Sequence, residues 1–127
     1  GAQTQVFVVD TIGELLHFYA AAHVAFVGGS LCEVGGHNVL EPAALGVPSV
    51  VGPHTFNFRD VTRHLLDAGG LRQVDDAEAM SAAVRGLLGD PAACRAMGDA
   101  SRRAVAELGG AVARTLDLAD EVLAGRR

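Results

Sequence analysis

The sequence predicts an α/β domain, a parallel sheet with flanking helices, and three observations lead to this prediction. Over about the first 75 residues, short β-branched runs alternate with segments whose apolar residues recur at helical spacing. Turn-forming residues, mostly glycine, separate the two kinds of segment. From about residue 76 the chain is alanine-rich and helical in pattern. Strands that alternate with helices are typical of a parallel sheet with helical crossovers.

In about the first 75 residues, the predicted strands and helices are delimited by residues that break a strand or cap a helix. The predicted strands are valine-rich and end at Gly or Asp, which break a strand. Asn38 is a plausible N-cap for a short helix that Gly46 closes, and Pro42 falls near its first turn, where a missing N–H costs little. The predicted strands cover residues 5–10, 24–27, 48–52 and 71–74, and the predicted helices cover residues 14–22, 39–45 and 58–68.

Two aspartates predict where the later helices begin. Asp75 or Asp76 caps a helix that runs to Leu88. Asp90 is an N-cap with Pro91 at the first helical position, where proline is favoured. That helix continues to about residue 108, glycines at 109–110 interrupt it, and a last helix reaches about residue 124. We therefore expect a helical tail over about residues 76–127.

Length and charge exclude several classes of protein. The 127 residues are the size of one domain. The net charge of -5 argues against nucleic acid as a partner, and the absence of Lys excludes a P-loop.

Cys32 and Cys94 have no metal-ligand spacing, and no histidine pair has a third ligand nearby, so no metal is predicted. With no signal peptide and no apolar run of roughly 20 residues, the chain itself is expected to be soluble.

Three polar, Gly-rich loops follow the ends of predicted strands, at residues 10–14, 28–38 and 52–57. Ligands of open α/β sheets bind at the carboxyl ends of the strands, so these loops are expected to share one crevice. Residues 35–38 (GGHN) lead directly into a helix. Backbone N–H groups at a helix N-terminus bind phosphate without a Lys, and glycine permits close approach. A tight turn with an Asn cap is the alternative for this segment.

Glu41 lies three residues after Asn38 and has two interpretations. It is either the return half of a capping box or a carboxylate that faces the crevice. In the second case it suits a ribose, because a carboxylate accepts hydrogen bonds from both hydroxyls of a vicinal diol.

Residues 41–48 (EPAALGVP) resemble the nucleotide-binding signature of GT-B glycosyltransferases. A wider match narrows this resemblance to the Kdo (3-deoxy-D-manno-octulosonic acid) transferases, and specifically to their C-terminal, Rossmann-like domain. Four segments carry it in the right order, namely residues 10–15 (DTIGEL), 25–31 (AFVGGSL), 35–42 (GGHNVLEP) and 52–58 (GPHTFNF).

The resemblance implies a binding site for a cytidine monophosphate sugar. Glu41 would hold the ribose, and Gly35, Gly36, His37 and Asn38 would hold the phosphate. Ser30 and Asn57 are weaker candidates for the same crevice. The wall on the base and phosphate side would be formed by Thr11, Ile12, Gly13, Glu14 and Leu15.

The resemblance also implies the reaction, which is transfer of Kdo from CMP-Kdo to a lipid A precursor in lipopolysaccharide biosynthesis, without a cofactor. The family's general base lies in an N-terminal domain that this chain lacks, so no catalytic residue is assigned. Because the chain starts at Gly1 and a full nucleotide-binding domain has about six strands, we expect an N-terminally truncated C-terminal domain that is inactive alone. The full-length protein would work at the cytoplasmic face of the bacterial inner membrane, the only form for which membrane association is expected.

Two alternatives remain open from the residues. One is the donor-binding domain of another GT-B enzyme that uses a UDP-sugar, which the spacing of residues 41–48 alone would permit. The other is a noncatalytic nucleotide-binding module, because the chain is short and has no assigned base.

Overall fold

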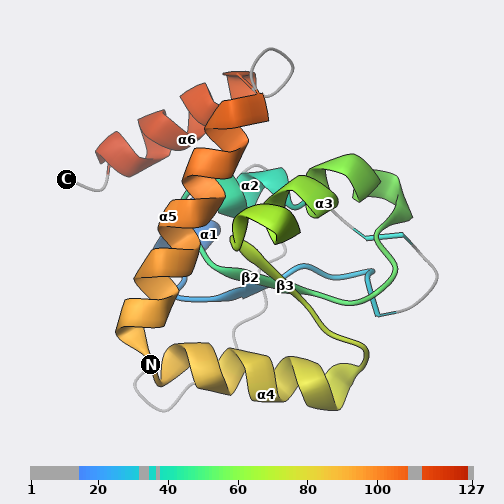
Figure 1. The fold of residues 1–127 in the computed structure, drawn as a ribbon. Coiled ribbons are helices and arrows are strands. Elements are labelled where there is room, and N and C mark those ends of the chain that lie inside the picture. Colours follow the sequence, from blue (N-terminus) through green and yellow to red (C-terminus); the bar gives the residue numbers. More distant parts are fainter. Residues whose placement is uncertain (1–14, 32–34, 37, 109–112, 126–127) are drawn as a thin grey trace.

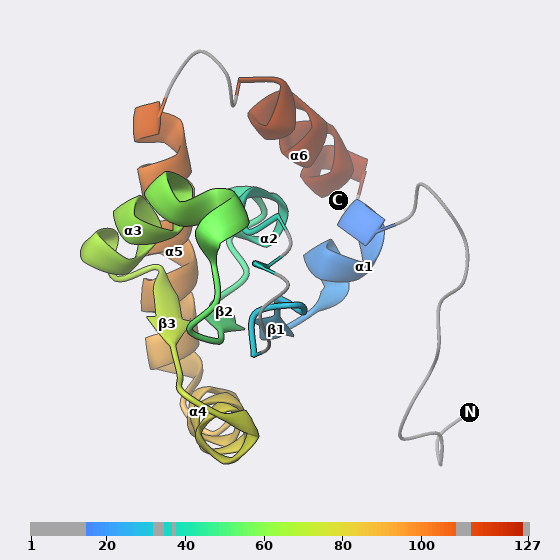
Figure 2. The same ribbon diagram turned by 90° about the vertical axis from the view of Figure 1, so that its right-hand side faces the viewer.

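The computed structural model describes residues 15–31, 35–36, 38–108 and 113–125. Over these residues the chain forms a three-stranded parallel sheet with helices on both faces (Figures 1 and 2). The elements in chain order are α1 (Leu15–Ala21), β1 (Ala25–Phe26), α2 (Leu40–Ala44), β2 (Ser49–Val51), the 3-10 turn η1 (Phe56–Phe58), α3 (Arg59–Ala68), β3 (Leu71–Gln73), α4 (Ala77–Leu88), α5 (Pro91–Leu108) and α6 (Ala113–Gly125).

The sheet confirms the predicted α/β architecture. Strand β2 lies in the middle, with β1 and β3 parallel to it on either side. In the register, Phe26 pairs with Val50, and Val50 pairs with Arg72. Helix α2 connects β1 to β2, and α3 connects β2 to β3, so the sheet is built from two βαβ units. The strand predicted over residues 5–10 lies outside the described residues.

Two apolar clusters lie on the two faces of the sheet. Val51 belongs to the larger cluster, which includes Leu65 of α3 and Val105 of α5, all fully buried. Val50, the next residue back along β2, points to the opposite face and packs with Leu87 of α4 in the smaller cluster. Figure 2 shows this layering, with α4 on one side of the strands and α2 and α3 on the other. Both valines are buried because the central strand is covered on both faces.

Helix α5 is part of the core. It packs against α2 and α3, and Ser101 donates a hydrogen bond to the carbonyl oxygen of Gly70. A β-carbon on Gly98 would overlap the carbonyl oxygen of Gly46, so glycine is required for this close approach. The residues predicted as a helical tail therefore hold the sheet and its crossover helices together.

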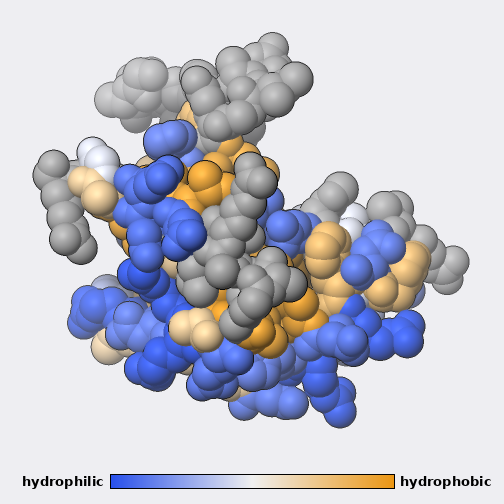
Figure 3. Space-filling model, turned by 90° about the horizontal axis from the view of Figure 1, so that it is seen from above, coloured by the Kyte–Doolittle hydropathy of each residue, from blue (hydrophilic) through white to orange (hydrophobic). Residues whose placement is uncertain are grey.

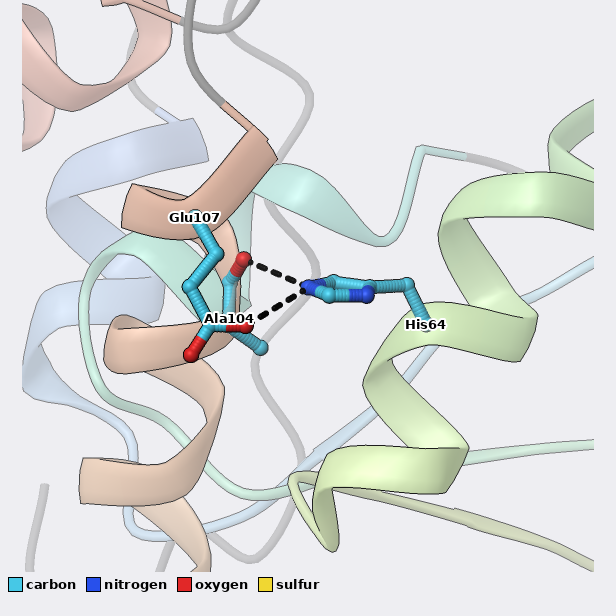
Figure 4. A network of polar contacts seen from close by, with 3 residues as sticks. All are labelled: His64, Ala104 and Glu107. Atoms are coloured by element: carbon cyan, nitrogen blue, oxygen red, sulfur yellow. Dashed lines mark hydrogen bonds and ion pairs between the residues drawn. The ribbon is translucent and has the colours of Figure 1, made fainter.

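A histidine also connects α3 to α5 (Figure 4). The His64 Nε2 atom lies 2.9 Å from the carbonyl oxygen of Ala104 and 3.4 Å from Oε2 of Glu107. The contact with a carbonyl requires the tautomer with hydrogen on Nε2. These contacts give the His64 side chain a structural role in joining α3 to α5, and not a role in the loops of the predicted crevice.

The predicted helix starts of the second half are confirmed. Asp76, rather than Asp75, caps α4 by accepting a hydrogen bond from the backbone N of Ala79 at 2.8 Å. Asp90 accepts from the backbone N of Ala93 at 3.1 Å, and Pro91 is the first residue of α5. These caps form from residues within one turn of each other, which is why the sequence predicts them.

One predicted loop contains a helical turn. Residues 53–57 were expected to be irregular, but η1 covers Phe56–Phe58, and the backbone N of Phe58 donates to the carbonyl oxygen of Thr55 at 3.0 Å. The turn leads directly into α3 and so shortens the loop.

The surface on the α6 side of the molecule combines apolar and hydrophilic residues. Figure 3 shows apolar residues toward the middle of this view and hydrophilic residues around them. Leu108 of α5 and Leu118 of α6 are among the exposed large apolar side chains. Within the described ranges, no helix is both long and apolar enough to cross a membrane.

Candidate functional site

A pocket of about 350 Å³ opens beside the carboxyl end of β1. Three segments form its wall, namely one face of α1, the turn after β1 and the start of α2. This is the edge of the sheet at which open α/β folds bind their ligands. The residues that line the pocket are Leu15, Tyr19, Gly28, Asn38 and Glu41.

Asn38 and Glu41 form one polar unit at the start of α2. The Oδ1 atom of Asn38 accepts a hydrogen bond from the backbone N of Leu40 at 2.9 Å. Its Nδ2 atom donates to Oε1 of Glu41 at 3.4 Å. Asn38 therefore fixes the helix start and holds the carboxylate in the pocket wall, where the second oxygen has no hydrogen-bond partner among the described residues and is able to accept from a ligand.

The details of this helix start differ from the prediction in two ways. The N-cap position is occupied by Val39, which has helical φ and ψ, so Asn38 acts from one residue further out. Glu41 pairs with the side chain of Asn38, whereas a capping box would pair it with a backbone N–H. The arrangement favours the interpretation in which Glu41 faces the crevice.

Tyr19 is a lining residue that the sequence did not single out. It is half-buried on α1, on the same face as Leu15 four residues earlier. Burial raises the pKa of the Tyr19 phenol, and the nearby Glu41 carboxylate raises that pKa further. The phenol therefore keeps its proton at pH 7 and is able to donate a hydrogen bond. An aromatic residue at helical spacing is typical of a core-facing position, so sequence alone gave no signal for it.

Ser30 joins the two loops that leave β1 and β2. Its hydroxyl donates to the carbonyl oxygen of Val27 at 2.7 Å and accepts from the backbone N of Gly52 at 2.9 Å. The backbone N of His54 donates to the carbonyl oxygen of Ser30 at 2.9 Å. Ser30 is fully buried and is not among the lining residues, so the structure gives it a role in loop positioning.

Gly35 and Gly36 are held against the loop after β2. Their φ angles are +98° and +85°, which favour glycine. Asn57 donates to both carbonyl oxygens, from its backbone N to Gly35 at 3.0 Å and from Nδ2 to Gly36 at 3.3 Å. A β-carbon on Gly35 would lie 2.5 Å from a ring carbon of Phe56. Packing between the two loops therefore explains both glycines, and neither lines the pocket.

The remaining predicted contacts stay predictions. Thr11, Ile12, Gly13, Glu14 and His37 lie outside the described residues. Helix α2 has five residues, and the N–H of its first residue, Leu40, is already donated to Asn38. The N-terminus of this short helix therefore attracts an anion more weakly than the N-terminus of a longer helix would. In the ranges that the structure describes, no group of three or more His, Cys, Asp or Glu residues could hold a metal ion.

Known proteins resemble this chain in sequence and in fold. It is 43% identical over 123 residues to a 3-deoxy-D-manno-octulosonic acid transferase of Bordetella pertussis, a match that covers 97% of this chain and 29% of that protein. A Haemophilus influenzae protein of the same name is 42% identical over 116 residues, covering 91% of this chain and 27% of that protein. The chain thus spans less than a third of these relatives, and the predicted resemblance to Kdo transferases is confirmed.

A solved structure has the same fold. The crystal structure of the C-terminal CMP-Kdo binding domain of WaaA from Acinetobacter baumannii aligns with a TM-score of 0.78 at 39% identity. The alignment covers 82% of this chain and 54% of that one. Residues 1–104 match the model of the family described as glycosyl transferases group 1. With most of its length inside that match, the chain belongs to the group 1 glycosyl transferases.

Proposed function

We propose that this chain is the donor-binding domain of a Kdo transferase and that it binds CMP-Kdo in the pocket beside β1. The observation that carries the proposal is the Glu41 carboxylate, which Asn38 holds in a pocket at the carboxyl edge of a parallel sheet. The fold around this pocket is similar to a domain described as CMP-Kdo binding, which supports the choice of donor.

In this proposal each wall of the pocket has its own task. Glu41 accepts hydrogen bonds from the ribose hydroxyls, and the apolar parts of Leu15 and Tyr19 contact the nucleoside. The phosphate is proposed to lie toward residues 35–38, as the family resemblance implies; of the backbone N–H groups there, that of Gly36 already donates to the carbonyl oxygen of Gly29 at 3.0 Å. The described residues thus bind and orient the donor, and Ser30 and Asn57 position the loops behind them.

The acceptor side belongs to the rest of the enzyme. Since the chain spans 29% and 27% of the two relatives, we propose that the general base and the site for a lipid A precursor lie in another domain of the full-length protein. That protein would work in lipopolysaccharide biosynthesis at the cytoplasmic face of the inner membrane. The chain alone is then expected to bind the donor without transferring Kdo.

A nucleotide titration tests the proposal. Calorimetry of the chain with CMP, UMP and UDP compares their dissociation constants, first for the wild type and then for Glu41→Gln. Loss of a charged hydrogen-bond acceptor costs about 1.5–3 kcal/mol, so the CMP dissociation constant should rise roughly 10- to 100-fold. Glu121→Gln, an exposed carboxylate on α6, is the matched control and should leave the constant unchanged.

The other outcomes would replace the proposal. Tighter binding of UDP than of CMP would identify the donor domain of a different glycosyltransferase. Equal binding of all three nucleotides, insensitive to Glu41→Gln, would favour a noncatalytic nucleotide-binding module. No binding by a chain that circular dichroism shows to be folded would exclude an independent donor site.

A further inference from the structure

Among the described residues of the pocket wall, Tyr19 is the single aromatic one, and the proposed function gives it no polar task. Leu15 and Tyr19 supply the α1 side of the pocket, while Asn38 and Glu41 supply the α2 side. Helix α1 packs against α2, which keeps the two sides in contact. The Tyr19 ring also packs against the larger core cluster, so its position is fixed by the fold.

The polar groups in the pocket suit a hydroxyl that both donates and accepts. The Glu41 carboxylate is an acceptor only, and its Oε1 atom is already oriented by Asn38. The Tyr19 phenol keeps its proton next to this carboxylate, because burial and the Glu41 charge both disfavour the phenolate. Of these two lining residues, Glu41 is thus able to accept a hydrogen bond and Tyr19 is able to donate one. A ribose 2′-hydroxyl satisfies both groups at once.

We infer that Tyr19 is a specificity-determining residue of the donor pocket, which together with Glu41 makes the site select ribonucleotides over 2′-deoxyribonucleotides. The inference rests on the proposed function, because it takes the nucleoside of the donor as the occupant. The 2′-hydroxyl donates to Glu41 and accepts from the Tyr19 hydroxyl. A 2′-deoxyribonucleotide leaves both groups without that partner, and sites built to hydrogen-bond a hydroxyl reject analogues that lack it.

Binding of CMP and 2′-deoxy-CMP to the wild type and to Tyr19→Phe tests this inference. Removing the phenolic oxygen keeps the ring, so the packing with α2 is retained. We expect the CMP dissociation constant to rise about 3- to 10-fold, the range for one net hydrogen bond, while that of 2′-deoxy-CMP stays the same. The preference for CMP over 2′-deoxy-CMP therefore falls by the same factor.

Phe18→Leu is the matched control, since Phe18 is the next residue on α1, is 43% exposed and does not line the pocket. This variant should keep the wild-type preference. A defect in packing would weaken both nucleotides alike, so the preference separates a polar role of Tyr19 from a structural one.

Two results would overturn the inference and are distinguishable from each other. If Tyr19→Phe weakens both nucleotides equally or neither of them, while Glu41→Gln still weakens CMP, the inference fails and the proposed function stands. If the folded wild-type chain binds no CMP, the proposed function fails and the inference fails with it.

Discussion

The loops at the carboxyl edge of the sheet and the helix pair α4–α5 satisfy their backbone polar groups in different ways. We call residues 28–31, 35–36 and 52–58 the loop edge. Its hydrogen bonds join residues that are distant in sequence, as when the backbone N of Gly52 donates to Ser30 and that of Asn57 donates to Gly35. The separation is 22 residues in each case, so these bonds exist only after the strands have paired.

The helix pair uses partners from the same turn. Asp76 accepts from Ala79, and Asp90 accepts from Ala93, each three residues away. These caps depend on local geometry and are exposed at the surface. The comparison indicates that the loop edge is maintained by tertiary contacts, and that substitutions at the loop edge should cost more than similar ones in the helix pair.

The largest difference is expected between two Gly→Ala substitutions. A β-carbon on Gly52 would overlap the backbone of Ser30, so Gly52→Ala should lower the free energy of unfolding by about 3 kcal/mol. Gly86 lies exposed inside α4 with nothing within 4 Å of its added β-carbon, so Gly86→Ala should raise it by about 0.5–1 kcal/mol. Urea unfolding followed by circular dichroism measures both. Equal effects of the two substitutions would contradict the comparison.

The next effect concerns two side chains that accept from backbone N–H groups. Ser30→Ala leaves the N–H of Gly52 and the carbonyl of Val27 without this hydroxyl in a buried place, and should cost about 2 kcal/mol. Asp76→Ala removes an exposed cap and should cost about 1 kcal/mol. Both are read from urea midpoints at constant m-value. A larger loss for Asp76→Ala would show that the local cap matters more than the loop edge.

Removing a buried hydroxyl should change the free energy of unfolding in opposite directions at two helix positions, Thr62 and Ser101. The Oγ1 atom of Thr62 on α3 is buried and has no hydrogen-bond partner within the described part of the chain. Thr62→Val should therefore stabilise the fold by about 1 kcal/mol. Ser101→Ala on α5 removes the donor to Gly70 and should destabilise it by about 1 kcal/mol. Thermal unfolding gives both signs, and destabilisation by Thr62→Val would mean that the hydroxyl has a partner in solution.

The smallest predicted effect is a shift in the pKa of one side chain, the Tyr19 phenol. Tyr19 is the chain's single tyrosine and tryptophan is absent, so phenolate absorbance reports on this residue alone. Its pKa should lie above the ordinary 10.0, chiefly because of burial. Glu41→Gln removes the second cause and should lower the pKa of Tyr19 without returning it to 10.0. A return to 10.0 would mean that the Glu41 charge, rather than burial, is the main cause.

The same ionisation affects stability. Between pH 10.0 and the raised pKa of the folded state, the unfolded phenol has lost its proton while the folded phenol keeps it. The unfolded state then binds fewer protons, so the free energy of unfolding should fall as the pH rises through this window. Tyr19→Phe should remove that part of the pH dependence in unfolding measured at pH 9 to 11.

Features that depend on neighbouring residues were predicted well from the sequence. The start of α5 at Pro91 and the end of α3 before Gly69 follow from cap chemistry that one turn of chain determines. Lining residues Leu15, Asn38 and Glu41 were also named in advance. Asn38 and Glu41 lie at a helix start after a predicted strand, a position that is visible in the sequence, whereas Leu15 was named only because the resemblance to Kdo transferases implies it.

Features that depend on long-range packing could not be predicted. That Gly35 approaches a phosphate stays a prediction, but its positive φ and its close contact with Phe56, which arise where two loops meet, had no signal in the sequence. Ser30 was named as a candidate for the crevice, and its hydrogen bond with the backbone of a residue 22 positions away could not be foreseen from the sequence. Tyr19 lines the pocket only because α1 packs against α2, an arrangement that apolar spacing alone does not specify.

The central claim is that this domain binds CMP at the edge where the pocket lies. Amide NMR spectra of the folded chain, recorded during titration with CMP and separately with UDP, test it most directly. We predict that CMP binds more tightly and that the largest shifts fall on the pocket wall. Shifts that cluster on the helix pair α4–α5 instead, or none at all, would contradict the account. The residues expected to respond are Leu15, Tyr19, Gly28, Asn38 and Glu41.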